Sequence, residues 1–282
     1  MPKLFIYGLG YSSLYIAQAA LKAGFSVAGT TRSAEKAAWL RAQGIEAIAL
    51  SPAGERGSEE ALYSATHILS SVPPQGDGDP VIPLLPPIPN PQSPIPYLAY
   101  LSTTGVYGDW AGAWVDESSE LRGDTPRLKA RMAAEQAWLA RGGHVFRLAG
   151  IYGPGRSAID DVKDGTARRI DKPGQVFSRI HVEDIAQTVL ASMQKPQPGT
   201  VYNLCDDEPA PAHEVVQYAC ELLGVAPPPL VPFEQANLAP MAQEFYAGNR
   251  RVKNDRIKNE LGISLQYPSY REGLNALTQP SP

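Results

Sequence analysis

The stretch Leu4-Phe5-Ile6-Tyr7-Gly8-Leu9-Gly10-Tyr11-Ser12-Ser13 decides the fold. Its first four residues form an unbroken hydrophobic run, typical of a strand that is buried on both faces of a sheet. The apolar residues between Leu14 and Leu21 then recur with helical spacing, and Gly24 stands where a glycine commonly ends a helix. A strand, a glycine-rich turn and a helix in this order predict the start of a parallel α/β sheet.

The same alternation of strand and helix patterns continues along the chain. We expect a helix that is capped by Ser33 and runs through Leu40. Further helices are predicted at 125–141, 182–193 and 212–223, and further strands at 26–29, 45–50, 67–72, 97–102, 144–148, 176–180 and 201–204. This order predicts an α/β protein with a doubly wound parallel sheet.

A proline-rich stretch interrupts the alternation. Ten of the 27 prolines lie between Pro73 and Pro96, where such a sheet would carry a crossover helix. Proline removes a helical hydrogen-bond donor and clashes with the preceding turn, so at most a helical turn is expected, at Asp79–Leu85. The segment is interpreted as a degenerate crossover, with a proline-rich docking motif as the alternative.

Composition excludes several classes of protein. The formal net charge of −4 argues against a nucleic-acid partner, because such proteins need a basic surface. No apolar run approaches the roughly 20 residues that cross a bilayer, so no membrane association is expected. Two isolated cysteines and four histidines suggest neither a disulfide framework nor a metal site. The N-terminal residues lack the layout of a signal peptide, so a cytoplasmic protein is expected.

The glycine-rich turn is placed where a dinucleotide fingerprint belongs. Gly8 permits the tight turn, and Gly10 lets the backbone approach a pyrophosphate. Tyr11 and Ser12 open the helix, whose N-terminus supplies N–H donors and the positive end of its dipole. Ser13 replaces the third glycine, which serves packing between helix and strand, so no ligand contact is lost. A tight turn without a ligand is the alternative.

The end of the second strand favours one form of the cofactor. It reads Thr31-Arg32-Ser33, without the acidic residue that binds the ribose hydroxyls in sites that prefer NAD. Arg32 could pair with a 2′-phosphate through charge-assisted hydrogen bonds. NADP is therefore expected, with NAD as the alternative.

Four later segments carry a resemblance to a known family. They are 101–108 (LSTTGVYG), 147–155 (RLAGIYGPG), 179–186 (RIHVEDIA) and 201–204 (VYNL). In this order they resemble the motifs of the extended short-chain dehydrogenases, the NAD-dependent epimerase/dehydratase family. The resemblance implies a Rossmann fold with a small C-terminal α/β lobe. It places the dinucleotide-binding core at 1–155, to which 176–205 return, and the substrate-side lobe at 156–175 and 206–282.

The chain departs from this family at the catalytic pair. The resemblance implies a Tyr-x-x-x-Lys pair on the helix near 125–141 and a hydroxyl residue that Thr103 matches. The register of that helix puts Arg127 at the tyrosine and Arg131 at the lysine, and no tyrosine lies between Tyr107 and Tyr152. Arginine stays protonated at working pH, so Arg127 cannot act as general acid or base. The chain therefore resembles an atypical branch that has lost the pair.

The sugar-nucleotide dehydratases, one subclass of this family, are excluded by two further positions. Sugar-nucleotide dehydratases of this family carry an Asp-Glu pair directly after the catalytic threonine. Here those positions hold Thr104 and Gly105, which can act neither as acid nor as base.

Other residues are candidates for ligand contacts. Ser71 and Val72 lie at the carboxyl end of the predicted strand 67–72, where a cofactor should bind, and Ser102 ends the strand 97–102. Arg127 and Arg156 are candidates on the substrate side. Basic residues gather where relatives build the substrate pocket, and they form either an anion site or a solvated face: Arg156, Arg168, Arg169 and Lys172.

The remaining motif residues have ordinary structural explanations. His181 could titrate near neutrality, but its place beside a helix start indicates a structural role. Asp184 is expected to be a helix N-terminal acid. Trp110 and Trp114 either line the cleft or pack against the surface.

Two functions stay open from the sequence. The first is oxidoreductase or epimerase-type chemistry on a small molecule, for which an anion is one candidate, with Thr103 or a water as proton donor. The second is a catalytically silent protein that binds NADP or senses redox state. The helix near 125–141 could also form a homodimer interface, although its apolar residues could equally cover the sheet.

Overall fold

The computed structural model describes residues 1–50, 59–75, 78–86 and 97–279. The chain divides into two compact units, which are described separately. Unit 1 comprises Met1–Thr103, Thr125–Arg147 and Ile185–Tyr202, and unit 2 comprises Thr104–Asp124, Leu148–Asp184 and Asn203–Pro282.

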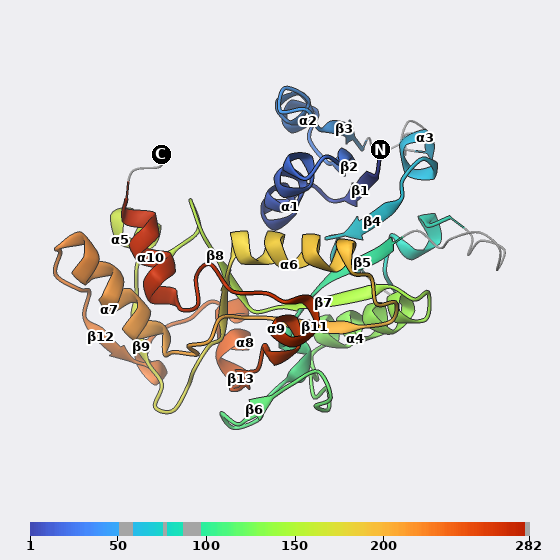
Figure 1. Ribbon diagram of the computed structural model, residues 1–282. Coiled ribbons are helices and arrows are strands. Elements are labelled where there is room, and N and C mark those ends of the chain that lie inside the picture. The colour runs from blue at the N-terminus through green and yellow to red at the C-terminus, as the bar shows by residue number, and fades with distance from the viewer. Residues whose placement is uncertain (51–58, 76–77, 87–96, 280–282) are drawn as a thin grey trace. The chain divides into compact units, whose positions relative to one another are not determined.

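Unit 1 is built on a seven-stranded sheet with the order β11-β7-β5-β4-β1-β2-β3 (Figure 1). Its strands are β1 (Lys3–Tyr7), β2 (Ser26–Thr31), β3 (Glu46–Ala49), β4 (His67–Ser70), β5 (Tyr97–Thr103), β7 (His144–Leu148) and β11 (Val201–Leu204). Pairing is parallel between β1 and both of its neighbours, and in the pairs β2–β3 and β4–β5. The predicted doubly wound sheet is confirmed.

The strand order reverses beside β1. The chain leaves β1 for β2 and β3, and then returns to place β4 on the other side of β1. In open α/β sheets ligands bind outside the carboxyl ends of the strands at such a switch point. In the register, Tyr7 pairs with Ser70, and Ser70 pairs with Tyr100. The carboxyl ends of β1, β4 and β5 therefore form one edge.

All helices of unit 1 except α3 (Glu59–Tyr63) were predicted from the sequence. The others are α1 (Tyr11–Lys22), α2 (Ala34–Arg41), α4 (Pro126–Leu139) and most of α6 (Val182–Gln194). Ser33 caps α2 by accepting from Lys36 N, and Thr125 caps α4, whose first residue is a proline. Gly24 adopts φ +85° just after α1, as predicted.

The core of unit 1 has apolar residues between the sheet and α4. Leu4, Phe5 and Ile6 of β1 are fully buried, which explains the unbroken hydrophobic run. Trp138 of α4 stacks on Tyr100 of β5 with ring centroids 5.7 Å apart. Its indole donates to Asp79, which also accepts from the backbone of the short 3₁₀ turn Ile82–Leu84. The helical turn expected at Asp79–Leu85 is thus present, whereas 76–77 and 87–96 of the proline-rich stretch lie outside the described residues.

Unit 2 contains short paired strands and a group of helices. Its strands are β6 (Trp114–Val115), β8 (Gly150–Tyr152), β9 (Arg169–Asp171), β10 (Arg179–His181), β12 (Leu230–Pro232) and β13 (Arg251–Val252). Its helices are α5 (Ala158–Lys163), α7 (Ala212–Leu223), α8 (Pro240–Ala247), α9 (Asp255–Leu261) and α10 (Tyr270–Thr278), with 3₁₀ turns at Thr104–Tyr107 and Phe233–Gln235. Helices α5, α7 and α10 lie together in Figure 1 and share an apolar cluster.

The predicted strand at 176–180 is displaced in the structure. Strand β10 starts at Arg179 and pairs with β8, whereas Phe177 makes an isolated bridge to Ala210. No helix in the described part of the chain combines the length and apolar character that crossing a membrane requires.

Candidate functional site

The turn from Gly8 to Ser13 is fixed by hydrogen bonds at the carboxyl end of β1. Gly8 N donates to Thr30 Oγ1 over 3.0 Å, and Leu9 N donates to Thr30 O over 2.8 Å. Gly8 adopts φ +82°, a conformation that side chains rarely tolerate. A Cβ at Gly8 would also come within 3.0 Å of Ser71 Oγ. The tight turn predicted for Gly8 is therefore present.

Ser13 closes the same turn from the first turn of α1. Its hydroxyl donates to Gly8 O over 2.7 Å, and it accepts from Gly10 N over 2.7 Å. Ser13 is 1% exposed, so it faces the loop rather than solvent. The sequence indicated only a packing position here. The structure shows that serine replaces the glycine with two hydrogen bonds that hold the loop.

The loop fits a dinucleotide. A Cβ added at Gly10 would meet Ser13 Oγ at 3.9 Å and Gly8 O at 4.0 Å, which are ordinary contact distances, so the residue is not crowded. Tyr11 and Ser12 lie at the start of α1, where the backbone N–H groups of the first turn have no partner within the helix. An uncrowded backbone at Gly10 and a helix N-terminus beside it suit a pyrophosphate. Gly8, Gly10, Tyr11 and Ser12 are thus the residues that would hold it.

The end of β2 presents a cation. Thr31 is the last residue of β2 and is buried, whereas Arg32 and Ser33 are exposed. Ser33 is occupied as the N-cap of α2. The side chain of Arg32 is therefore accessible to a ligand at this strand end, and no carboxylate accompanies it in the segment Thr30–Ser33.

Ser71 and Val72 follow β4 and lie against the glycine-rich turn. Ser71 N donates to Tyr7 O over 2.9 Å, which extends the pairing of β1 and β4 by one residue. Ser71 Oγ donates to Gly8 O and lies 3.5 Å from Ser13 Oγ. Both predicted residues therefore border the turn. Their contact with a cofactor stays a prediction.

Ser102 belongs to a buried network. Its hydroxyl donates to Glu135 of α4 over 2.6 Å, and Arg147 of β7 donates to the same carboxylate over 2.7 Å and 3.1 Å. Glu135 is 1% exposed and Arg147 is 5% exposed. The network fixes α4 to the ends of β5 and β7. Ser102 and Arg147 belong to motifs that the sequence marks, but nothing in the sequence indicates that they meet at Glu135.

The two arginines that replace the catalytic pair differ in surroundings. Arg127 is exposed in the first turn of α4. Arg131 is half-buried, and its Nη1 donates to Tyr100 Oη over 2.7 Å and to Leu101 O over 3.0 Å. Thr103, the predicted catalytic hydroxyl, is the last residue of β5 and half-buried. Unit 1 thus has no phenol on α4.

His181 of unit 2 packs against two tyrosine rings. Its ring centroid is 5.1 Å from that of Tyr152 and 3.9 Å from that of Tyr267. Its Nδ1 accepts from Glu183 N, and its buried Nε2 has no hydrogen-bond partner within the described residues. Burial lowers the pKa of His181 to about 4, so the ring is neutral at neutral pH. This supports the structural role expected for it.

Asp184 also has a structural role. It accepts from Gln266 N over 2.7 Å and from Tyr267 N over 3.0 Å, so it holds the chain before α10. Burial raises the pKa of its carboxyl. Asp184 does lie in the first turn of α6, as expected, but its backbone contacts outside the helix were not foreseen.

Three residues of the predicted basic cluster hold the chain of unit 2. Arg168 donates to Ala236 O, Arg169 donates to Pro228 O over 3.2 Å, and Lys172 donates to Tyr246 O. These bonds tie β9 and its flanks to the segment 228–246. Arg156 is exposed after β8, and its role on the substrate side stays a prediction.

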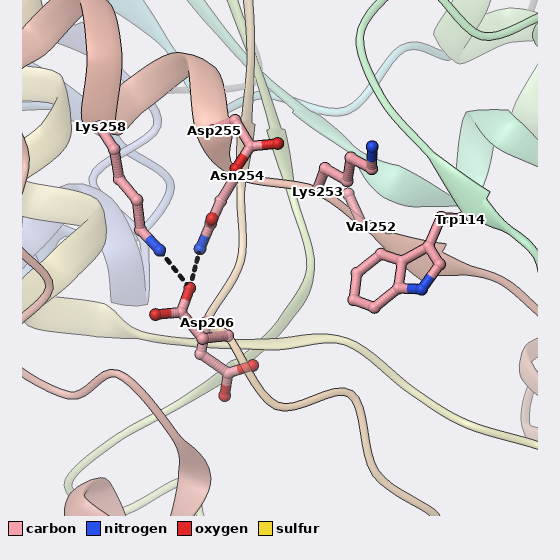
Figure 2. Close-up of a pocket in the computed structure, with 8 residues that line it drawn as sticks. Trp114, Asp206, Val252, Lys253, Asn254, Asp255 and Lys258 are labelled. Carbon is pink, nitrogen blue, oxygen red and sulfur yellow. Dashed lines mark hydrogen bonds and ion pairs between the residues drawn. The ribbon is translucent and has the colours of Figure 1, made fainter.

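A hollow of about 280 Å³ opens on unit 2 (Figure 2). It is lined by Trp114, Asp206, Asp207, Val252, Lys253, Asn254, Asp255 and Lys258. Asp207 accepts from Lys258 over 2.5 Å and from Asn254 over 2.6 Å. Much of its polar lining is therefore already paired. Of these residues only Trp114 was singled out from the sequence.

Comparisons with known proteins give matches over most or part of the chain. No protein-family model matches it. A solved structure of a functionally unknown conserved protein from Silicibacter pomeroyi is 45% identical, with a TM-score of 0.88 over 98% of both chains. The protein YeeZ of Escherichia coli is 27% identical over 95% of this chain and 97% of its own length. A 3-diazoavenalumate denitrifying reductase from Streptomyces is 30% identical over 57% of this chain, and the match spans only 58% of that protein.

More distant structures share the fold. A dTDP-glucose 4,6-dehydratase from Bacillus anthracis in complex with NAD has a TM-score of 0.75 at 15% identity, over 98% of this chain and 95% of its own. A human epimerase family protein with NADPH has a TM-score of 0.70 at 16% identity, over 97% and 98%. The chain thus has the fold of NAD-dependent epimerase/dehydratase structures, as its sequence resemblance predicted, and it belongs to the same family as the functionally unknown conserved protein of Silicibacter pomeroyi.

Proposed function

We propose that this chain binds NADP(H) along the carboxyl edge of the sheet in unit 1, and prefers it to NAD(H). The observation that carries the proposal is the end of β2, where exposed Arg32 follows buried Thr31 without a carboxylate. The 2′-phosphate would receive charge-assisted hydrogen bonds from Arg32, whereas ribose hydroxyls would find no acidic acceptor. Gly8, Gly10, Tyr11 and Ser12 would hold the pyrophosphate, with Ser33, Ser71, Val72 and Ser102 as further cofactor-side residues.

We further propose that the protein is a reductase whose hydride acceptor needs no proton from a phenol. A bound NADPH would supply the hydride. The chain offers Thr103 at the end of β5 but only arginines at the two helix positions of the catalytic pair. Arg127 and Arg156 are proposed as substrate-side cations, which suits an anionic substrate.

The Streptomyces relative supports this reaction class. Its name describes a reductase that removes nitrogen from a diazo compound, by name a carboxylate. When a hydride replaces a diazonium group, the C–H bond forms as the C–N bond breaks and dinitrogen leaves with the bonding electrons. No proton donor is needed in that exchange. The missing tyrosine is therefore compatible with turnover of electrophiles of this kind.

A catalytically silent NADP-binding or redox-sensing protein is the second candidate. The loss of the Tyr-x-x-x-Lys pair favours it. NADPH deuterated at the transferred position separates the two functions. With an aryl diazonium carboxylate as the acceptor, a reductase leaves deuterium on the product ring, and boiled protein serves as the control. A silent protein binds NADPH and transfers no deuterium.

Calorimetry tests the cofactor preference. The wild type is expected to bind NADPH at least several-fold more tightly than NADH. Arg32→Asp should weaken NADPH binding by about 1–3 kcal/mol, the scale of a hydrogen bond to a charged group. Lys22→Asp, which makes the same charge change at the exposed far end of α1, should leave it unchanged. Equal affinities for the two cofactors in the wild type would refute the preference.

A further inference from the structure

Arg131 is held in place by neutral groups. Its Nη1 donates to the phenol oxygen of Tyr100 and to the backbone carbonyl of Leu101. Tyr100 is fully buried and stacks on Trp138, so the anchor is rigid. The guanidinium has five N–H donors in a fixed plane, and these two bonds use only those of one nitrogen.

The charge of Arg131 is not compensated by a carboxylate. Within the residues that the structure describes, Arg131 forms no ion pair, and its Nε and Nη2 make no hydrogen bond. Glu135, one helical turn further along α4, already accepts from Ser102 and Arg147. Arg147 shows the contrast, because its Nε and Nη2 both donate to that carboxylate. Arg131 is therefore a fixed cation with spare donors.

The anchor of Arg131 lies at the ligand-binding edge of the sheet. Tyr7, Ser70 and Tyr100 form one row across β1, β4 and β5. One residue further along each strand come Gly8, Ser71 and Leu101. The carbonyl that holds Arg131 thus belongs to the row of the glycine-rich turn, two strands or roughly 10 Å from Gly8 and two residues before Thr103.

We propose that Arg131 binds a carboxylate of the substrate through its free Nε and Nη2 donors, beside Thr103. These two nitrogens present a parallel pair of N–H groups, which can bind a carboxylate in a bidentate manner. A cation held by a buried tyrosine keeps this geometry without ligand, so little side-chain freedom is lost on binding. The inference rests on the proposed function and adds the substrate class to it: a small organic carboxylate that lies at the end of β5.

The test compares a carboxylate with its uncharged analogue. Benzoate and benzamide are titrated by ligand-observed NMR into the protein saturated with NADP⁺. The wild type should bind benzoate in preference to benzamide. Arg131→Gln should weaken benzoate binding about tenfold or more and leave benzamide binding unchanged. Lys129→Ala, which removes an exposed cation two residues away on α4, is the matched control and should bind both like the wild type.

Two further variants separate charge from geometry. Arg131→Lys keeps the charge without the planar pair of donors, and should recover only part of the benzoate affinity. Tyr100→Phe removes one anchor and should weaken benzoate binding less than Arg131→Gln does. Thermal melting of each variant establishes that it is folded.

The outcomes distinguish this inference from the proposed function. If Arg131→Gln binds benzoate like the wild type, or if the wild type shows no preference for benzoate, the carboxylate site is refuted while NADPH binding still stands. If Arg131→Gln instead loses NADP⁺ affinity tenfold, the cation serves the cofactor, and the inference fails. If the wild type binds no NADP⁺, the proposed function fails, and benzoate binding to the free protein still tests Arg131.

Discussion

The glycine-rich turn after β1 and helix α4 both belong to unit 1, but they differ in which positions of their motifs are replaced. The turn keeps glycines at Gly8 and Gly10 and has Ser13, which makes two hydrogen bonds, at the position of the packing glycine. Helix α4 holds Glu135 in a buried ion pair but has arginines at the two positions of the catalytic pair. The difference teaches that the glycine-rich turn and the catalytic pair can diverge separately on one sheet.

The largest expected effect is a loss of stability when the buried carboxylate of Glu135 on α4 is removed. Glu135→Gln should lower the free energy of unfolding by about 3–5 kcal/mol, because it leaves Arg147 as a buried charge without its partner. Urea unfolding measures this loss. NADPH affinity of the folded variant should stay unchanged, which would sharpen the contrast between packing and binding residues.

The control for this prediction removes both charges. The double variant Glu135→Leu, Arg147→Met should recover most of the lost stability, since replacing a buried pair by apolar groups is often neutral. A Glu135→Gln variant as stable as the wild type would show that the pair does not hold α4 to the sheet.

In unit 2, the buried side chain of His181 should make the free energy of unfolding depend on pH. The folded pKa of His181 is about 4, below its ordinary value of 6.5, because burial disfavours the charged ring. The unfolded chain therefore takes up a proton below pH 6.5 while the folded chain does not. The stability that His181 contributes should be fully present above pH 6.5, and about 3 kcal/mol of it should be lost as the pH drops to 4.

Chemical unfolding at a series of pH values tests this. His181→Phe should flatten the slope between pH 6.5 and 4, although not abolish it, because burial lowers the pKa of His67 and of His144 as well. An unchanged slope in His181→Phe would indicate that its ring titrates normally in the folded protein.

A smaller effect is expected at the turn itself. Gly8→Ala should cost about 1–2 kcal/mol, because φ +82° is strained for a side chain. The added methyl would also crowd Ser71 and Val72. Thermal unfolding measures this loss. A variant as stable as the wild type would show that the turn relaxes to another conformation.

The sequence predicted the sheet well, because its strands are buried hydrophobic runs bounded by helix caps. Strand β1, the cap at Ser33 and the end of α1 at Gly24 follow local rules and were confirmed. Among the short strands of unit 2, β10 was predicted with displaced bounds, at 176–180, and the others were not predicted. Segments of two or three residues, such as β13, carry no periodicity, and tertiary pairing alone defines them.

The candidate site was predictable only where local chemistry marks it. The turn at Gly8 and Gly10 is such a place. The meeting of Ser102, Glu135 and Arg147 was not, because these residues are up to 45 positions apart and one sequence does not reveal such pairs. The anchor of Arg131 on Tyr100 was missed for the same reason.

Titration of the wild type and of Gly10→Val with NADPH tests the central claim most directly. The valine should lower the melting temperature only slightly, because Gly10 has an ordinary negative φ of −89° and an added Cβ would lie 3.9 Å from the nearest atom. The small loss reflects that valine is a poorer N-cap residue than glycine. The wild type is expected to bind one NADPH per chain. Gly10→Val, whose side chain would fill the proposed pyrophosphate position, is expected to bind it about 100-fold more weakly, a loss of about 3 kcal/mol. A wild type that binds no NADPH, or a valine variant that binds it equally well, would contradict the account.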